Sequence, residues 1–249
     1  LLISTLFQKM TKGRKNRYYL AMLVTSLISV AADVIAVQLD KFGPGNVVAK
    51  YIFHRAFLLS HNLISPLYMV YLIARTDTWH KLKWSKLLKG ALYIPIFTVM
   101  LALLTNPLTK IMFYFDGNDT YTRGSCFLLL HIVAIFYVFF GTIYLWHYRK
   151  LFNKVSFISL MSVIPFIMIA SIIQLFFPWC IVELFATSCG LLFISMMVQR
   201  PEDTIDITTG LGRDSAYIDD LQRAFANEKP MQIIMINIAN YGAIFDMLG

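Results

Sequence analysis

Six ionisable side chains stand inside stretches of sequence that are otherwise apolar, and their types allow ion pairing, proton exchange or ligand binding. They are Asp33, His54, Arg55, His61, His131 and Glu183. An ionisable group within an apolar helix is costly unless it pairs or lines a polar cavity. We therefore expect these residues to lie at one level of the fold, with Asp33 pairing to Arg55 or His54.

Two interpretations of this set stay open. The residues could line an outward-facing pocket that senses a ligand, with Gln38 and Gln174 at the same level, or they could be internal ion pairs that hold helices together. A third interpretation is narrower. His54 and His61 are seven residues apart and share one helix face, which also allows a metal or haem pair.

The elements that must position these residues are membrane helices. The chain is 58% hydrophobic and 14% charged, whereas an ordinary soluble domain carries roughly 25% charged residues. A spanning helix needs about 20 mostly apolar residues. Six runs have this character: residues 18–39, 48–74, 87–105, 126–147, 155–177 and 180–198. Residues 1–7 are also apolar, and we interpret them as the end of a seventh, truncated helix.

Positive charge alternates between the loops that connect these runs. Lys and Arg are frequent in the first, third and fifth loops and sparse in the second, fourth and sixth. Cytoplasmic loops of membrane proteins carry this excess, so the odd loops and the C-terminal tail are predicted to be cytoplasmic. Because the basic residues lie between apolar runs, we attribute them to membrane topology and expect no nucleic-acid partner.

The C-terminal 49 residues differ from the rest of the chain. Residues 1–200 carry 19 of the 22 Lys and Arg and 6 of the 14 Asp and Glu, whereas residues 201–249 carry 3 and 8. We divide the chain into a transmembrane region, 1–200, a short linker, 201–206, and a cytosolic module, 207–249. The module predicts a helix over 214–227, a strand over 231–238 and a second helix from 239, the order of an α/β domain.

Two stretches of this tail carry a family pattern. Residues 206–214 read Asp-Ile-Thr-Thr-Gly-Leu-Gly-Arg-Asp, and residues 237–249 read Asn-Ile-Ala-Asn-Tyr-Gly-Ala-Ile-Phe-Asp-Met-Leu-Gly. In types and spacing, the tail resembles the first part of a GGDEF domain, the fold of diguanylate cyclases. The apolar runs predict an α-helical integral membrane bundle of about seven helices, and the resemblance implies that an incomplete α/β GGDEF-like module follows it.

The tail differs from the family pattern at the metal-binding positions. The resemblance assigns the catalytic divalent metal to Asn237, where the family has Asp, and to the backbone carbonyl of Ile238. A neutral amide is a weaker ligand than a carboxylate for a hard cation. We therefore expect little or no cyclase activity, no cofactor for residues 1–249, and Mg²⁺ only if an intact domain is active.

The nucleotide-binding positions depart as well. The resemblance assigns them to Tyr241, Gly242 and Phe245; Gly242 replaces a Lys, and Phe245 replaces the Asn that reads the guanine base. Phe cannot supply the amide hydrogen bonds of Asn. No residue of the tail is therefore assigned as catalytic.

The resemblance implies a multi-pass signalling protein of cyclic di-GMP pathways in a bacterial plasma membrane, with a transmembrane sensor coupled to a degenerate cytosolic GGDEF domain. The expected partners are the lipid bilayer, an unknown sensed ligand and a second copy of the chain bound through the cytosolic domain. Two alternatives stay open: an active diguanylate cyclase with an unusual metal site, and a polytopic transporter whose tail resembles the family by accident.

Overall fold

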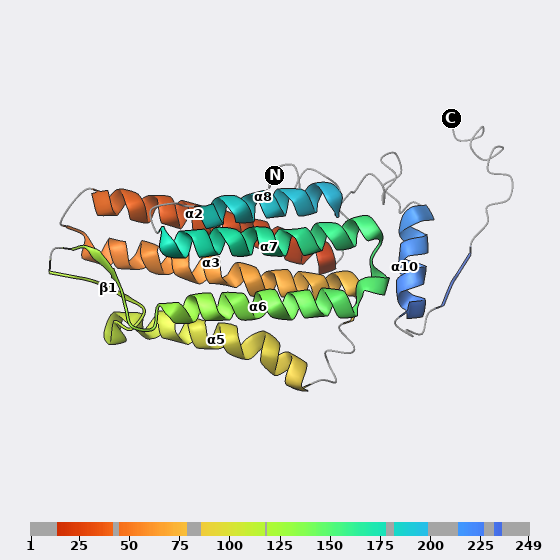
Figure 1. Cartoon of the computed structure of the whole chain (residues 1–249), viewed down its shortest axis with the longest axis horizontal. Coiled ribbons are helices and arrows are strands. Elements are labelled where there is room, and N and C mark those ends of the chain that lie inside the picture. Colours follow the sequence, from red (N-terminus) through yellow and green to blue (C-terminus); the bar gives the residue numbers. More distant parts are fainter. Residues whose placement is uncertain are drawn as a thin grey trace, which may run out of the picture.

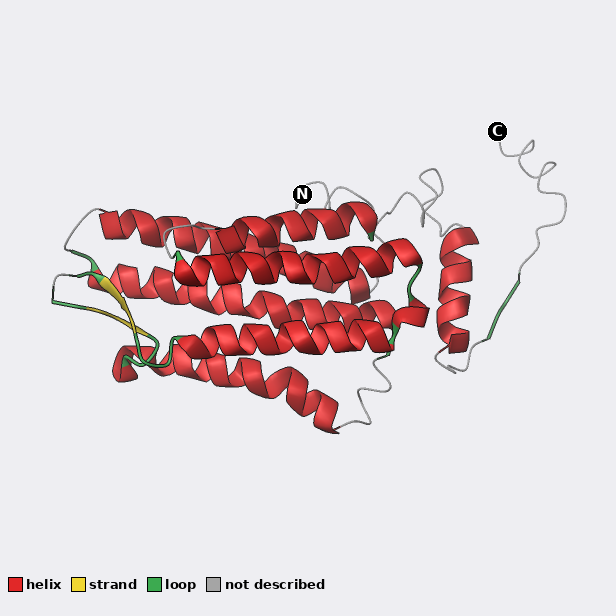
Figure 2. Cartoon of the chain, viewed as in Figure 1, coloured by secondary structure: helices red, strands yellow, loops and turns green. Residues whose placement is uncertain are grey.

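The computed structural model describes residues 14–41, 45–78, 86–117, 119–177, 182–198, 214–226 and 232–235. Its helices are α2 (Arg14–Lys41), α3 (Val47–Thr76), α5 (Lys86–Thr109), α6 (Leu128–His147), α7 (Lys154–Phe176), α8 (Val182–Met197) and α10 (Asp214–Ala226). A 3₁₀ turn, η1 (Arg149–Leu151), joins α6 to α7, and two short strands are β1 (Phe113–Phe115) and β2 (Tyr121–Arg123). Helices dominate the described part of the chain (Figure 2).

The six predicted apolar helices are confirmed as helices. Five of them, α2, α3, α5, α6 and α7, are long and apolar enough to cross a membrane. The sixth, α8, is apolar but has 16 residues, about 24 Å at 1.5 Å per residue, which is shorter than a hydrocarbon core of about 30 Å. Residues 1–7, interpreted as part of a seventh helix, lie outside the described residues.

The six helices lie side by side in one bundle (Figure 1). The most extensive packing joins α2 to α3 and α7 to α8. Buried tyrosines tie distant segments together: the Tyr19 hydroxyl donates to the Leu191 carbonyl at 2.9 Å, and the Tyr137 hydroxyl donates to the Leu92 carbonyl at 2.6 Å.

Large apolar side chains cover the outside of the bundle. Phe97, Phe139 and Ile143 are each more than 60% exposed. An exterior with many exposed large apolar side chains is unfavourable in water and favourable in lipid. The chain is therefore an integral membrane protein.

A β-hairpin covers one end of the bundle, and sequence reasoning did not predict it. β1 and β2 pair antiparallel, with Tyr114 opposite Thr122. The buried Asn106 of α5 anchors the hairpin: its Oδ1 accepts from the backbone N–H groups of Met112 and Phe113, and its Nδ2 donates to the Phe113 carbonyl. We call this end the hairpin end.

The opposite end of the bundle, which we call the tail end, faces α10 (Figure 1). The predicted helix over 214–227 is confirmed as α10. The predicted strand over 231–238 is wrong where it can be examined, because residues 232–235 form no strand. A strand needs a partner for its backbone hydrogen bonds, and in the described part of the chain β1 and β2 pair only with each other. An α/β module is thus not seen among the described residues.

Candidate functional site

Five of the six predicted ionisable residues interact with one another in the hairpin half of the bundle. We call the gathered set the polar network. It comprises Asp33 and Asp40 of α2, His54 and His61 of α3, His131 of α6, Ser171 and Gln174 of α7, and Glu183 of α8. Five helices contribute to it, so any change in the network alters contacts across most of the bundle.

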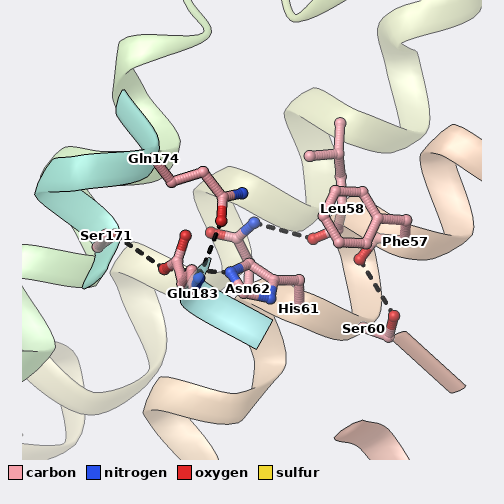
Figure 3. A network of polar contacts seen from close by, with 8 residues as sticks. All are labelled: Phe57, Leu58, Ser60, His61, Asn62, Ser171, Gln174 and Glu183. Atoms are coloured by element: carbon pink, nitrogen blue, oxygen red, sulfur yellow. Dashed lines mark hydrogen bonds and ion pairs between the residues drawn. The ribbon is translucent and has the colours of Figure 1, made fainter. Parts of the chain in front are cut away.

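The centre of the polar network is a buried ion pair between His61 and Glu183. His61 Nε2 lies 3.2 Å from Glu183 Oε1, and the Ser171 hydroxyl donates to the same oxygen at 2.8 Å. Gln174 Oε1 accepts the backbone N–H of Glu183 at 3.0 Å. Figure 3 shows Ser171 and Gln174 reaching Glu183 from one helix while His61 reaches it from another. A buried charge is tolerated when it is paired and hydrogen-bonded in this way.

Local helix geometry explains why two side chains of α7 form hydrogen bonds with Glu183. Ser171 and Gln174 are three residues apart and therefore lie on the same face of α7. Glu183 lies in the first turn of α8, where backbone N–H groups lack partners within the helix. Gln174 supplies an acceptor for one of these groups. The α7–α8 pair is thus fixed by side-chain contacts at its hairpin end.

A second ion pair joins α2 to α3. His54 Nε2 lies 3.0 Å from Asp40 Oδ2, so the predicted pairing of Asp33 with His54 is wrong. Helices α2 and α3 run antiparallel. Asp33 and Asp40 are seven residues apart in α2, and His54 and His61 are seven residues apart in α3. Placing Asp40 opposite His54 therefore brings Asp33 towards His61, and Asp33 interacts electrostatically with both imidazoles without an ion pair to either.

Arg55 is the one predicted ionisable residue that does not join the polar network. Within the described residues it makes no ion pair with Asp33, and its buried Nε has no hydrogen-bond partner. Consecutive residues of an α-helix point about 100° apart. Because His54 faces α2, Arg55 is turned away from Asp33, and the predicted Asp33–Arg55 pair is wrong.

His131 enters the network from α6. It interacts electrostatically with Glu183, His61 and Arg123. Its Nε2 is buried and has no hydrogen-bond partner among the described residues, and the same holds for Nδ1 of His61. Two imidazole nitrogens of the network are therefore left without the partner that buried polar atoms normally have.

A cavity of about 70 Å³ lies next to the ion pair. Its wall includes His61 and Glu183, and most of the remaining wall is apolar, with Ile64, Val163 and Leu191 among its residues. The cavity is bounded by α2, α3, α6, α7 and α8. It is a space within the apolar bundle that has one ionisable corner.

The β-hairpin covers the outer part of the polar network. The Tyr121 ring stacks on the His54 ring, with 4.6 Å between centroids, and Phe115 packs edge-on at 5.6 Å. The Lys50 ammonium donates to the Asp119 carbonyl at 3.3 Å. Burial raises the pKa of the Tyr121 hydroxyl above its usual range, which keeps it neutral beside the Asp40–His54 pair.

The tail end carries a buried polar cluster of a different kind, which we call the hydroxyl cluster. Its members are Thr76, Thr78 and Tyr144. The Thr76 hydroxyl lies 2.9 Å from that of Thr78 and 2.7 Å from that of Tyr144, and it also reaches the Leu72 and Ile73 carbonyls. Thr78 and Tyr144 are hydrogen-bonded to each other as well. None of these groups carries a charge at neutral pH.

The predicted metal and nucleotide positions of the tail cannot be placed in this geometry. Asn237, Ile238, Tyr241, Gly242 and Phe245 lie outside the described residues. Among the residues that are described, no three His, Cys, Asp or Glu side chains lie close enough together to hold a metal ion.

The site is therefore a carboxylate–imidazole network beside an apolar cavity, in the hairpin half of a membrane bundle. Sequence reasoning missed Asp40, Ser171 and the hairpin residues. Asp40 follows the predicted end of its helix at residue 39, and a lone Ser on an apolar helix gives no signal. No protein-family model, curated protein or solved structure matches the chain.

Proposed function

We propose that this protein is a membrane-embedded sensor that detects a signal at the hairpin end and passes it to its C-terminal tail. One observation carries the proposal: side chains from five helices meet in one polar network beside a cavity. Ionisable residues in membrane helices mark functional sites when they face the interior. A ligand or ion that altered the His61–Glu183 pair would act on α3, α7 and α8 together.

The distribution of charge supports an orientation for this sensor. Basic residues are frequent at the tail end, namely Arg14, Arg75, Arg149, Lys150 and Lys154. Under the positive-inside rule, this end would face the cytoplasm of a bacterial cell. The hairpin end, with its network and cavity, would then face the outside, where a signal arrives.

The output of the proposed sensor is the tail. Its likeness to a GGDEF domain over residues 206–214 and 237–249 supports a role in cyclic di-GMP signalling. Asn237 offers an amide oxygen where a carboxylate is needed to hold a hard cation. The tail would thus act as a regulatory or dimerising module with little or no cyclase activity.

The coupling between network and tail can be tested by hydrogen exchange of the purified protein in lipid nanodiscs. Glu183→Gln, which weakens the buried ion pair, should change the exchange rates of amides in α10. Asp116→Asn is the matched control, because it neutralises an exposed carboxylate at the same end and keeps a side-chain acceptor for Thr120 N–H. Identical α10 exchange in the Glu183→Gln variant and the unmodified protein would overturn the sensor proposal.

The enzymatic part has a separate test. Incubation of the protein with GTP and Mg²⁺ should yield no cyclic di-GMP, and Asn237→Asp should raise any residual turnover strongly. Ordinary cyclase rates, with turnover barely changed by Asn237→Asp, would favour the active cyclase with an unusual metal site.

A proton-coupled transporter is the second candidate function. The observation in its favour is the chain of carboxylates and imidazoles, since such chains form proton pathways in transporters. Reconstitution in liposomes with an internal pH-sensitive dye tests it. Proton flux that survives deletion of residues 201–249 and is lost in Glu183→Gln would favour transport over sensing.

A further inference from the structure

We propose that the cavity beside His61 and Glu183 binds a small apolar molecule that carries one hydroxyl group and is taken up from the membrane. This ligand class deepens the sensor role proposed above and rests on it. The size and lining of the cavity, the chemistry of its polar corner and the charges around it all favour such a ligand.

The cavity suits a short alkyl group. Its volume is about 70 Å³, and aliphatic residues such as Ile64, Val163 and Leu191 line it. An apolar cavity of roughly 150 Å³ stays dry and binds benzene. A space about half that size can accept a few carbon atoms of an alkyl chain, which gains the contacts that the wall atoms lack.

The polar corner has spare hydrogen-bond acceptor capacity. Within the described residues, the two side-chain donors to Glu183, Nε2 of His61 and the hydroxyl of Ser171, both bond its Oε1. A carboxylate accepts about four hydrogen bonds through its two oxygens. Because Glu183 lines the cavity, a hydroxyl group in the cavity can donate to this carboxylate.

The surrounding charges disfavour other head groups. Glu183 and Asp33 both interact electrostatically with His61, and their carboxylates would repel an anionic head group. A cationic head group would have to compete with His61 for Glu183, whose Oε1 also accepts from Ser171. A neutral hydroxyl group is not repelled by these carboxylates and does not displace His61 from Glu183. An uncharged alcohol also partitions into a bilayer and can reach the cavity from the lipid.

Photolabelling of the whole protein in nanodiscs tests this proposal directly. The probe is a primary alcohol of about five carbons that carries a diazirine, and labelled peptides are identified by mass spectrometry. We expect labels on the cavity-lining parts of α3 and α8. Excess pentan-1-ol should suppress this labelling about tenfold, and pentane or pentanoic acid should suppress it much less. Equal suppression by pentane would show an unselective apolar void and overturn the proposal.

Two neighbouring residues of α8 provide a matched pair of variants. Leu191 lines the cavity and is 5% exposed, whereas Leu192 is 46% exposed on the lipid side. Leu191→Trp should abolish labelling of α3 and α8, and Leu192→Trp should leave it unchanged. Labelling that survives Leu191→Trp in the folded protein would contradict the cavity as the site. If Leu191→Trp does not fold, the competition in the unmodified protein still decides.

Failure of the ligand class and failure of the sensor role give different results. Hydrogen exchange of α10 is measured with and without pentan-1-ol. Selective competition together with a change in α10 exchange supports both proposals. Selective competition without any change in α10 supports the ligand class and removes the signalling role.

Discussion

The two ends of the bundle each hold a buried polar cluster, and the clusters differ in chemistry. At the hairpin end, carboxylates face imidazoles in the pairs His61–Glu183 and His54–Asp40. At the tail end, the hydroxyl cluster joins α3 to α6 with neutral groups that satisfy one another. Holding helices together therefore does not require charge in this bundle, and the charged end needs another explanation.

Energetics sharpen this contrast. Replacing a buried ion pair with apolar residues of similar volume is often neutral or stabilising, whereas removing one partner is costly. Neutral hydrogen bonds between membrane helices contribute about 0.6 kcal/mol each on average. The ionisable groups of the polar network are thus a poor way to gain stability, which favours a functional role for them. Four substitutions test this difference between the two ends.

Glu183→Ala should cause the largest loss. It leaves the buried His61 without its counter-charge, and we expect the free energy of unfolding to fall by about 3–5 kcal/mol. The double variant His61→Leu with Glu183→Leu should recover most of that loss, because it removes both charges. Unfolding in mixed micelles of SDS and mild detergent measures both effects. A double variant as unstable as Glu183→Ala would mean that the pair is structural, like the hydroxyl cluster.

Asn106→Ala should have the next largest effect. The substitution leaves two backbone N–H groups and one carbonyl of the hairpin buried without partners, at a cost of about 3 kcal/mol. Hydrogen exchange should rise in 111–124 and stay unchanged at the tail end. Thr98→Ala in the same helix removes a bond that stays within α5 and should change neither region. Faster hydrogen exchange near Tyr144 in the Asn106→Ala variant would show that the two ends are not independent.

Tyr144→Phe tests the tail end with a smaller change. It removes the hydroxyl that bonds Thr76 and Thr78, and we expect a loss of about 1 kcal/mol. The same unfolding assay applies. The stability loss should be independent of pH between 5 and 8, because none of the three groups titrates there. A pH-dependent loss would show that the two ends are electrostatically linked.

Asp40→Asn should have the smallest effect. The Asp40 side chain is 32% exposed, and partly exposed pairs of this kind contribute about 0–1 kcal/mol. We expect a change in unfolding free energy at the lower end of that range. A loss comparable to that of Glu183→Ala would show that the His54–Asp40 pair contributes as much to stability as the His61–Glu183 pair.

The sequence was sufficient to predict the helices and the gathering of polar residues. Each apolar run of about 20 residues became a helix, and five of the six predicted ionisable residues interact with one another. The reason is that a bilayer leaves a long apolar segment few alternatives, and a charge in it must turn inward.

The pairing of these residues could not be predicted in the same way. Which imidazole meets which carboxylate depends on the register of α2 against α3, and the sequence does not encode that register as a local pattern. The hairpin was missed because its strands have three residues each, too short for an alternating pattern. Its position depends on Asn106, a single buried side chain whose contacts appear only once α5 and the hairpin are assembled.

The stacking of Tyr121 on His54 allows the position of the hairpin to be followed by NMR spectroscopy. The two rings are 4.6 Å apart with an interplanar angle of 20°, a geometry in which the ring current of the tyrosine shifts the imidazole proton resonances to lower frequency. The chain has five histidines, so selective isotope labelling of histidine gives a spectrum simple enough to assign. The chemical shift of His54 would then report, without any added probe, whether the hairpin is seated on the bundle.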